Sequence, residues 1–138
     1  MRLARSYLAG NQSASISLLT ASLLSSGFEA PVVAERISVT ELGLVAPHIV
    51  VLDIDNLDID PLELLRMIRF VLPGCVIAVY SGTLEQDWAL ACHLAGANCV
   101  LSKGSDEAHI SAGLRQATAI GCFTDPRFVA IRAAKVTQ

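Results

Sequence analysis

Residues 48–55 read HIVVLDID, in which four aliphatic side chains are followed by an acidic pair interrupted by one isoleucine. A continuous apolar run of this length is typical of a strand that is buried on both faces, as in a parallel β-sheet. Similar runs occur on both sides of it, among them VIAVY at residues 76–80 and CVL at residues 99–101. Together the runs predict five strands, over residues 3–9, 31–34, 48–53, 75–80 and 98–101.

Longer amphipathic segments separate these runs, and the spacing of their apolar residues is typical of helices. The predicted helices span residues 13–26, 39–44, 61–72, 84–95 and 106–120. The clearest is 61–72, where Pro61 suits the first helical position and Asp60 the N-cap. Strands that alternate with helices predict an α/β fold: a doubly wound, five-stranded parallel sheet between two layers of helices.

Composition excludes several classes of protein. The chain has 138 residues, enough for one domain with its own core, and a formal net charge of −3. Its basic residues are scattered, which argues against a nucleic-acid-binding surface, and no apolar run approaches the roughly 18 residues of a membrane-spanning helix. The four cysteines form no C-x-x-C pair, and the three histidines lack metal-ligand spacing. We expect a cytoplasmic protein without membrane contact, with reduced thiols; Cys75 and Cys99 are expected near each other.

Three polar residues stand at the ends of three predicted strands: Asp53, Ser81 and Lys103. Ligands of an open parallel sheet bind outside the carboxyl ends of its strands, so these side chains are expected to share one crevice. A carboxylate can act as a nucleophile toward phosphorus. A hydroxyl can donate a hydrogen bond to a phosphoryl oxygen, and a lysine supplies a positive charge. The ordered triple therefore predicts a phosphoryl-transfer site.

The segments PHIVVLDID (47–55), DPLELLRMIR (60–69), VIAVYSG (76–82) and AGANCVLSKG (95–104) together resemble the receiver domain of two-component response regulators. The resemblance runs from residue 3 to about residue 116. It implies a flavodoxin-like (CheY-like) fold, with Asp53 as the phosphoacceptor, Ser81 as the switch hydroxyl and Lys103 as the lysine that pairs with the phosphoryl group. It further implies a sensor histidine kinase as partner, and a signalling role instead of an enzymatic one.

The segment AGLRQATAIGCFTDPRF (112–128) resembles the end of a receiver of the LuxR-type class, in which a helix-turn-helix DNA-binding domain follows. We therefore expect a receiver domain at residues 1–122. Residues 123–138 are expected to form a C-terminal tail or the start of a linker helix to an output domain that this sequence does not contain. DNA contact and control of transcription are expected only through that domain. The apolar residues of the last helix and of FVAIRAAKV (128–136) favour a homodimer.

Two positions of the expected metal site depart from the receiver pattern. Receivers carry an acidic pair after the first strand, which binds Mg²⁺ together with the phosphoacceptor, but Asn11 and Gln12 take those places here. Mg²⁺ sites are normally built on carboxylates, water and phosphate. Metal binding through Asp53 and Asp55 is therefore expected to be weak or absent.

Two further departures leave alternatives open. Val100 replaces the aromatic residue usual three positions before the lysine, and Gly104 replaces the proline that often follows it. The lost acidic pair and Val100 favour a pseudo-receiver, a phosphorylation-independent module for dimerisation or for binding a partner or ligand. A more remote alternative is a phosphatase of the haloacid-dehalogenase type. The segment Asp53-Ile-Asp55 resembles the nucleophile motif of that family. That family usually has its nucleophile on the first strand, and Leu57 stands where threonine or valine is usual.

Overall fold

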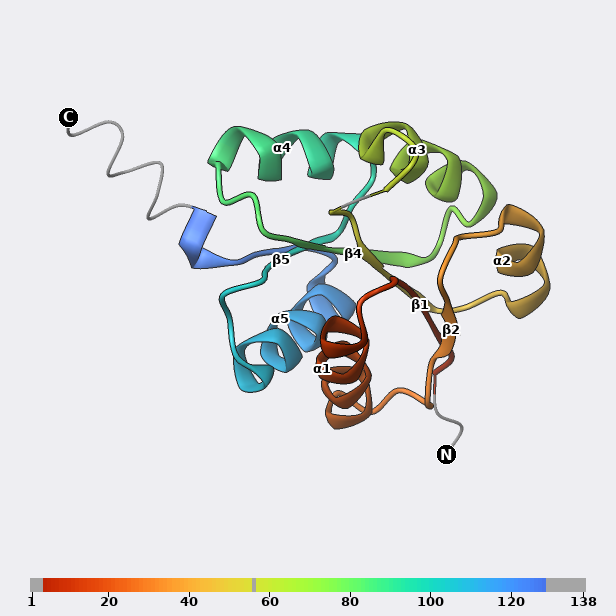
Figure 1. Ribbon diagram of the computed structural model, residues 1–138, viewed down its shortest axis with the longest axis horizontal. Helices are drawn as coiled ribbons and strands as arrows, with labels where there is room; N and C mark the ends of the chain where they lie inside the picture. The colour runs from red at the N-terminus through yellow and green to blue at the C-terminus, as the bar shows by residue number, and fades with distance from the viewer. Residues whose placement is uncertain (1–3, 56, 129–138) are drawn as a thin grey trace.

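The computed structural model describes residues 4–55 and 57–128 (Figure 1). Strands and helices alternate along the chain. The strands are β1 (Ser6–Ala9), β2 (Val32–Ala34), β3 (Ile49–Asp53), β4 (Val76–Ser81), β5 (Cys99–Ser102) and β6 (Phe123–Thr124). The helices are α1 (Ser13–Ser25), α2 (Val39–Val45), α3 (Pro61–Val71), α4 (Gln86–Ala95) and α5 (Glu107–Ile120). All strand pairs are parallel, in the order β2-β1-β3-β4-β5-β6, which confirms the predicted doubly wound α/β fold.

The helices begin where local chemistry favours it. Asp60 caps α3 by accepting a hydrogen bond from the Leu62 amide at 3.1 Å, and Pro61 occupies the first helical position, as predicted. Ser38 caps α2 and Asp106 caps α5 in the same way. Each cap satisfies an amide that the first helical turn leaves without an intrahelical partner.

Side chains of the strands alternate between two core layers, one on each face of the sheet. In β1, Tyr7 packs in the layer beneath α2, α3 and α4, whereas Leu8 packs in the layer beneath α1 and α5. Figure 1 shows α1 and α5 on one side of the sheet and α3 and α4 on the other. Cys75 and Cys99 belong to opposite layers, so the expectation that they lie near each other was wrong. The four cysteines are free thiols.

The sixth strand was not predicted, and the expected number of five strands was wrong in this respect. β6 is only two residues long and pairs with β5 at the edge of the sheet, with Phe123 beside Cys99 and Thr124 beside Val100. A two-residue strand has no periodicity for sequence analysis to detect. Further along, Phe128 is fully buried in the layer beneath α3 and α4. The expected tail therefore packs on the domain over residues 123–128, and residues 129–138 lie outside the described part of the chain.

Trp88, the single tryptophan of the chain, lies near the start of α4. It is partly buried and packs against the same core layer as Phe128. Its indole nitrogen Nε1 is buried and has no hydrogen-bond partner among the described residues. Most buried tryptophans do find such a partner, so Trp88 is held in this layer by packing and not by its indole N–H.

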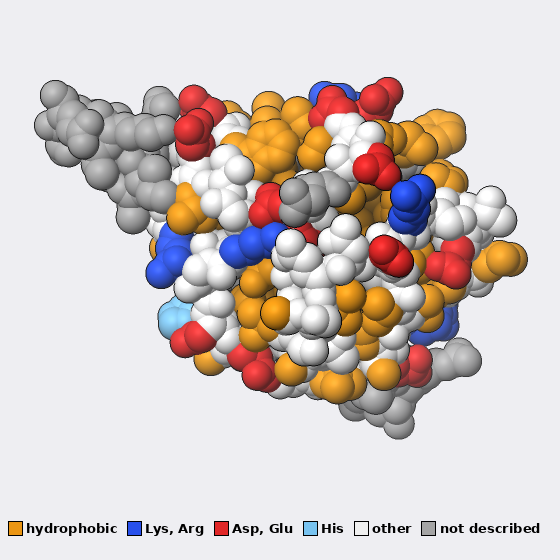
Figure 2. Space-filling view, viewed as in Figure 1, with side chains coloured by type: hydrophobic (Ala, Val, Ile, Leu, Met, Phe, Trp, Pro, Cys, Tyr) orange, Lys and Arg blue, Asp and Glu red, His pale blue; other side chains and the backbone are white. Residues whose placement is uncertain are grey.

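Large apolar side chains are exposed on the outer surface of α3 and α4. Phe70 and Leu94 are 88% and 80% exposed, and Met67 and Leu90 are also exposed. Figure 2 shows apolar side chains gathered over these two helices, whereas the basic side chains on this face are scattered. No helix within residues 4–55 and 57–128 combines the length and hydrophobicity that crossing a membrane requires.

Candidate functional site

Asp53 ends β3 in the middle of the sheet. All five residues of the strand are buried, and Asp53 itself is only 4% exposed. Its Oδ1 accepts a hydrogen bond from the Asp55 amide at 3.2 Å, which fixes the turn that follows the strand. A carboxylate this deeply buried requires a partner of opposite charge or several hydrogen-bond donors.

Lys103 supplies the positive charge. It directly follows β5, and its backbone amide donates to the Ser81 carbonyl at 3.0 Å. Its Nζ lies 2.9 Å from Asp53 Oδ1 and 2.9 Å from Asp55 Oδ2, so one ammonium joins two carboxylates. Burial opposes the charged form, but the hydrogen bonds to Asp55 and Asp53 outweigh it and raise the pKa of Lys103 above its ordinary value.

Asp55 is held from a second side by the turn after β4. The Gly82 amide donates to Asp55 Oδ2 at 3.0 Å. A Cβ added to Gly82 would lie 3.0 Å from the same oxygen, so the close approach favours glycine. The sequence predicted Asp55 beside Asp53 at the expected metal site but did not predict its ion pair with Lys103.

Ser81 lies at the same edge of the sheet and is fully buried. Its hydroxyl accepts a hydrogen bond from the Thr83 amide at 3.0 Å and donates to the Thr83 carbonyl at 3.4 Å. The hydroxyl therefore stabilises the turn between β4 and α4 in this conformation. The structure brings Asp53, Asp55 and Lys103 into direct contact, and Ser81 contributes through its backbone carbonyl.

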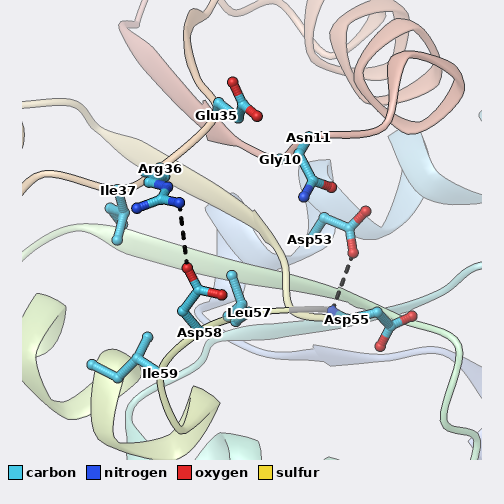
Figure 3. A pocket seen from close by; sticks show the side chains of 10 residues that line it. All are labelled: Gly10, Asn11, Glu35, Arg36, Ile37, Asp53, Asp55, Leu57, Asp58 and Ile59. Atoms are coloured by element: carbon cyan, nitrogen blue, oxygen red, sulfur yellow. Dashed lines mark hydrogen bonds and ion pairs between the residues drawn. The ribbon is translucent and has the colours of Figure 1, made fainter.

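The two amide residues after β1 are placed differently. Asn11 lines a pocket next to Asp53, and Figure 3 shows its side chain extending toward Asp53. Gln12 is the exposed N-cap residue of α1, makes no capping hydrogen bond with its side chain, and is not among the lining residues. The backbone passes close to the acid at this point, since a Cβ on Gly10 would lie 3.4 Å from the Asp53 Cβ.

The pocket beside Asp53 has a volume of about 290 Å³. Its outer wall contains Glu35, Arg36 and Asp58, which sequence reasoning missed (Figure 3). Arg36 and Asp58 form an exposed ion pair at 3.7 Å. The strand-end rule, applied to the strand predicted at residues 31–34, would have pointed to Glu35. The remaining lining residues are Gly10, Asn11, Ile37, Asp53, Asp55, Leu57 and Ile59.

The two carboxylates of this site are already paired with a cation. Within the described ranges, no group of three or more histidine, cysteine, aspartate or glutamate side chains is arranged to hold a metal ion. Asp53 and Asp55 already bind Lys103, and the expected acidic pair is replaced by Asn11 and Gln12. With two carboxylates (−2) and one ammonium (+1), the three contacting side chains sum to −1. The geometry therefore describes a charge-paired carboxylate site, in which the lysine is the cation that faces Asp53.

Comparison with known proteins establishes the fold. No protein-family model and no curated protein matches the chain. Among solved structures it is similar to the receiver domain of RcsB from Salmonella enterica serovar Typhimurium, in the presence of phosphomimetic BeF3−, with a TM-score of 0.77 and 13% identity over 94% of this chain and 98% of that one. A LuxR-family two-component response regulator from Aurantimonas sp. SI85-9A1 has a TM-score of 0.75 and 21% identity over 99% and 100% of the two chains.

A response regulator from Thermotoga maritima has a TM-score of 0.74 and 19% identity, over 85% of this chain and 99% of that one. At these identities the similarity confirms the flavodoxin-like fold of receiver domains. The roles predicted for Asp53, Ser81, Lys103, Asn11 and Gln12, and any metal bound by Asp53 and Asp55, stay predictions. A fold hosts many functions, so the function has to be argued from the site.

Proposed function

We propose that this chain is a signal-receiver domain, the input module of a bacterial two-component response regulator. The observation that carries the proposal is the buried Asp53 carboxylate, 2.9 Å from Lys103 Nζ at the carboxyl edge of the sheet. A nucleophilic carboxylate faced by a lysine, with a serine at the end of the neighbouring strand, is the arrangement that a phosphoryl-binding site requires. The similarity to solved response-regulator structures supports the same reading.

Two modes of action are compatible with this function. In the first, Asp53 accepts a phosphoryl group from a sensor histidine kinase, and Lys103 and Ser81 bind it. In the second, the domain is a pseudo-receiver that signals through protein contacts without phosphorylation. Three observations favour the second mode. Lys103 is shared between two carboxylates, the Ser81 hydroxyl is hydrogen-bonded to Thr83, and Asn11 brings an amide to the pocket. Lys103 must leave at least one carboxylate before it can bind a phosphoryl group with its full charge.

The partners and the cellular location follow from the proposed function. The output domain would be a DNA-binding domain of the LuxR-type class in a longer protein, and the similarity to a solved chain from a LuxR-family response regulator agrees with this proposal. A cytoplasmic location agrees with that role. The exposed Phe70 and Leu94 on α3 and α4 offer apolar surface for a homodimer or another protein partner. The tail that was expected to contribute lies mostly beyond the described residues.

The deciding experiment is intact-mass spectrometry after incubation with acetyl phosphate and Mg²⁺. Four chains are compared: the native sequence, Asp53→Asn, the double variant Asn11→Asp with Gln12→Asp, and that double variant with Asp53→Asn. We expect little or no phosphoryl adduct on the native chain. The acidic double variant should gain one adduct, because it restores the carboxylates that Mg²⁺ requires. Adding Asp53→Asn to it should abolish the adduct.

Other outcomes change the conclusion in defined ways. A single adduct on the native chain that Asp53→Asn removes would establish the first mode and reject the second. If the acidic double variant is folded by circular dichroism but takes no phosphoryl group, Asp53 and Lys103 do not form a receiver site. The proposed function would then be wrong.

A further inference from the structure

The last described residues form a helical turn that is tied to the sheet. The Asp125 amide donates to the Val100 carbonyl at 2.9 Å, which extends the pairing of β6 with β5. Asp125 Oδ1 accepts from the Arg127 amide at 2.9 Å, as a helix N-cap does, and Pro126 follows at the first helical position. The Phe128 amide donates to the Asp125 carbonyl at 3.1 Å, and its ring is fully buried. We call residues 125–128 the C-terminal turn.

Asp125 also contacts the loop that carries Lys103. It is only 5% exposed, and its Oδ2 accepts a short hydrogen bond from the Ser105 hydroxyl. The loop is itself tightly folded on the buried Ser102, which accepts from the Gly104 amide through its hydroxyl and from the Ser105 amide through its carbonyl, both at 3.1 Å. Only one residue, Gly104, separates the lysine from the serine whose hydroxyl holds the turn.

A second contact joins the same two segments. The Arg127 guanidinium lies over Gly104, so that a Cβ added to Gly104 would be 1.5 Å from Arg127 Nη1. Position 104, where receivers often carry proline, is therefore occupied by glycine, which lets the Arg127 side chain approach. Arg127 is long and flexible, so an alanine at this position would displace it at little cost in stability but would break the contact.

The space around these contacts allows movement. A cavity of about 420 Å³ lies between the loop and the turn, lined by Gly104, Ser105, Asp106, His109, Asp125, Pro126 and Arg127. Close-packed interiors transmit displacement between neighbours, but a loop next to open volume can shift without a clash. The loop can therefore change position when the partners of Lys103 change.

From these contacts we infer that the loop of residues 103–105 couples the Asp53 site to the C-terminal turn, through the hydrogen bond from Ser105 to Asp125 and the contact of Arg127 with Gly104. The pairing state of Lys103 sets the position of the loop, and the loop sets how firmly the turn is held. The inference rests on the proposed function in one respect only, since it takes Asp53 and Lys103 as the input.

Amide hydrogen exchange of the whole chain tests the coupling, because it reports local opening residue by residue. The informative amides are those of Phe123, Asp125 and Phe128, each of which is hydrogen-bonded. Ser105→Ala should speed their exchange about fivefold, the effect of losing one ordinary hydrogen bond. Lys103→Gln should also speed it, although Lys103 contacts none of the three residues directly. In the double variant the exchange should be no faster than in the faster single variant, since both changes act on one link.

The matched control is Ser25→Ala, which removes a hydroxyl-to-carboxylate hydrogen bond of 3.0 Å between the end of α1 and Glu107 of α5. It should leave the exchange of the turn unchanged. Gly104→Ala should speed this exchange, and should have no further effect in an Arg127→Ala background. The inference is wrong if Lys103→Gln leaves the turn unchanged, or if the effects of Lys103→Gln and Ser105→Ala multiply. Neither measurement needs a phosphoryl group, so a failure of this inference can be distinguished from a failure of the proposed function.

Discussion

Lys103 is one positive charge between two carboxylates, and it is the residue on which the site depends. Asp53 Oδ1 and Asp55 Oδ2 each lie 2.9 Å from its Nζ. The convergence of Asp53 with Lys103 could be predicted from the sequence, because strand ends of a parallel sheet share one edge. The position of the Asp55 side chain could not be predicted, because it depends on the turn after β3 and on the amide of Gly82. Neither follows from a repeating pattern in the sequence.

Replacing Lys103 by methionine should therefore be costly to the fold. The Asp53 side chain is only 3% exposed, and removing its cation leaves a buried carboxylate without charge compensation. We expect Lys103→Met to lower the free energy of unfolding by about 3 kcal/mol in urea titrations near neutral pH. Adding Asp53→Asn should recover a large part of the loss. The control Arg36→Met breaks an exposed pair and should change stability by less than about 1 kcal/mol. Equal stability of Lys103→Met and the native chain would contradict this account.

At the scale of elements, periodicity predicted the five longer strands and the five helices, and it was least accurate at their ends. The helix expected over residues 84–95 begins at Gln86, and the strand expected over residues 3–9 is regular only from Ser6, with residue 3 outside the described ranges. β6 was missed because its support is tertiary. The Phe123 ring packs on Gly113 of α5, and Thr124 Oγ1 lies 2.7 Å from His93 Nε2 of α4. Contacts of this kind leave no trace in local sequence.

The packing of β6 on α5 predicts an effect on stability opposite to the one usually seen when alanine replaces glycine in a helix. An alanine normally stabilises a helix relative to glycine by up to about 1 kcal/mol. At Gly113, however, an added Cβ would lie 2.6 Å from the Phe123 ring, so Gly113→Ala should lower the free energy of unfolding by about 1–3 kcal/mol. Gly43→Ala in α2 is the control, since its Cβ would meet nothing within 4 Å, and it should be neutral or stabilising. Chemical denaturation of both variants decides the matter, and a stabilised Gly113→Ala would refute the packing argument.

For the molecule as a whole, the buried thiols contribute to the change of stability in alkaline solution. Burial raises the pKa of Cys75 from its ordinary 9.0 to about 11 and that of Cys92 to about 12, and it raises the pKa of Cys99 as well. The unfolded chain loses these protons near pH 9, whereas the folded chain keeps them to higher pH. The folded state then binds more protons, so the free energy of unfolding falls as pH rises.

We therefore expect stability from these groups to be complete below about pH 9 and to decline above it, as measured by urea unfolding under reducing conditions at a series of pH values. Cys92→Ala should make the decline shallower by about 1.4 kcal/mol per pH unit, the contribution of one proton. If Cys92→Ala does not alter the slope, the thiol is not protonated in the folded state over this range.

Trp88 gives the domain an optical property of its own. A lone indole whose N–H is buried without a hydrogen bond is shielded from the reorientation of water that shifts tryptophan emission toward red wavelengths. The emission maximum of the native protein should consequently lie at a shorter wavelength than that of a solvent-exposed tryptophan. It should move to longer wavelength when α4 separates from the layer that also holds Phe128. Because no second tryptophan contributes, a shift of the emission maximum can be assigned to the surroundings of Trp88. The intrinsic fluorescence of the unlabelled protein therefore reports how closely α4 packs on the sheet.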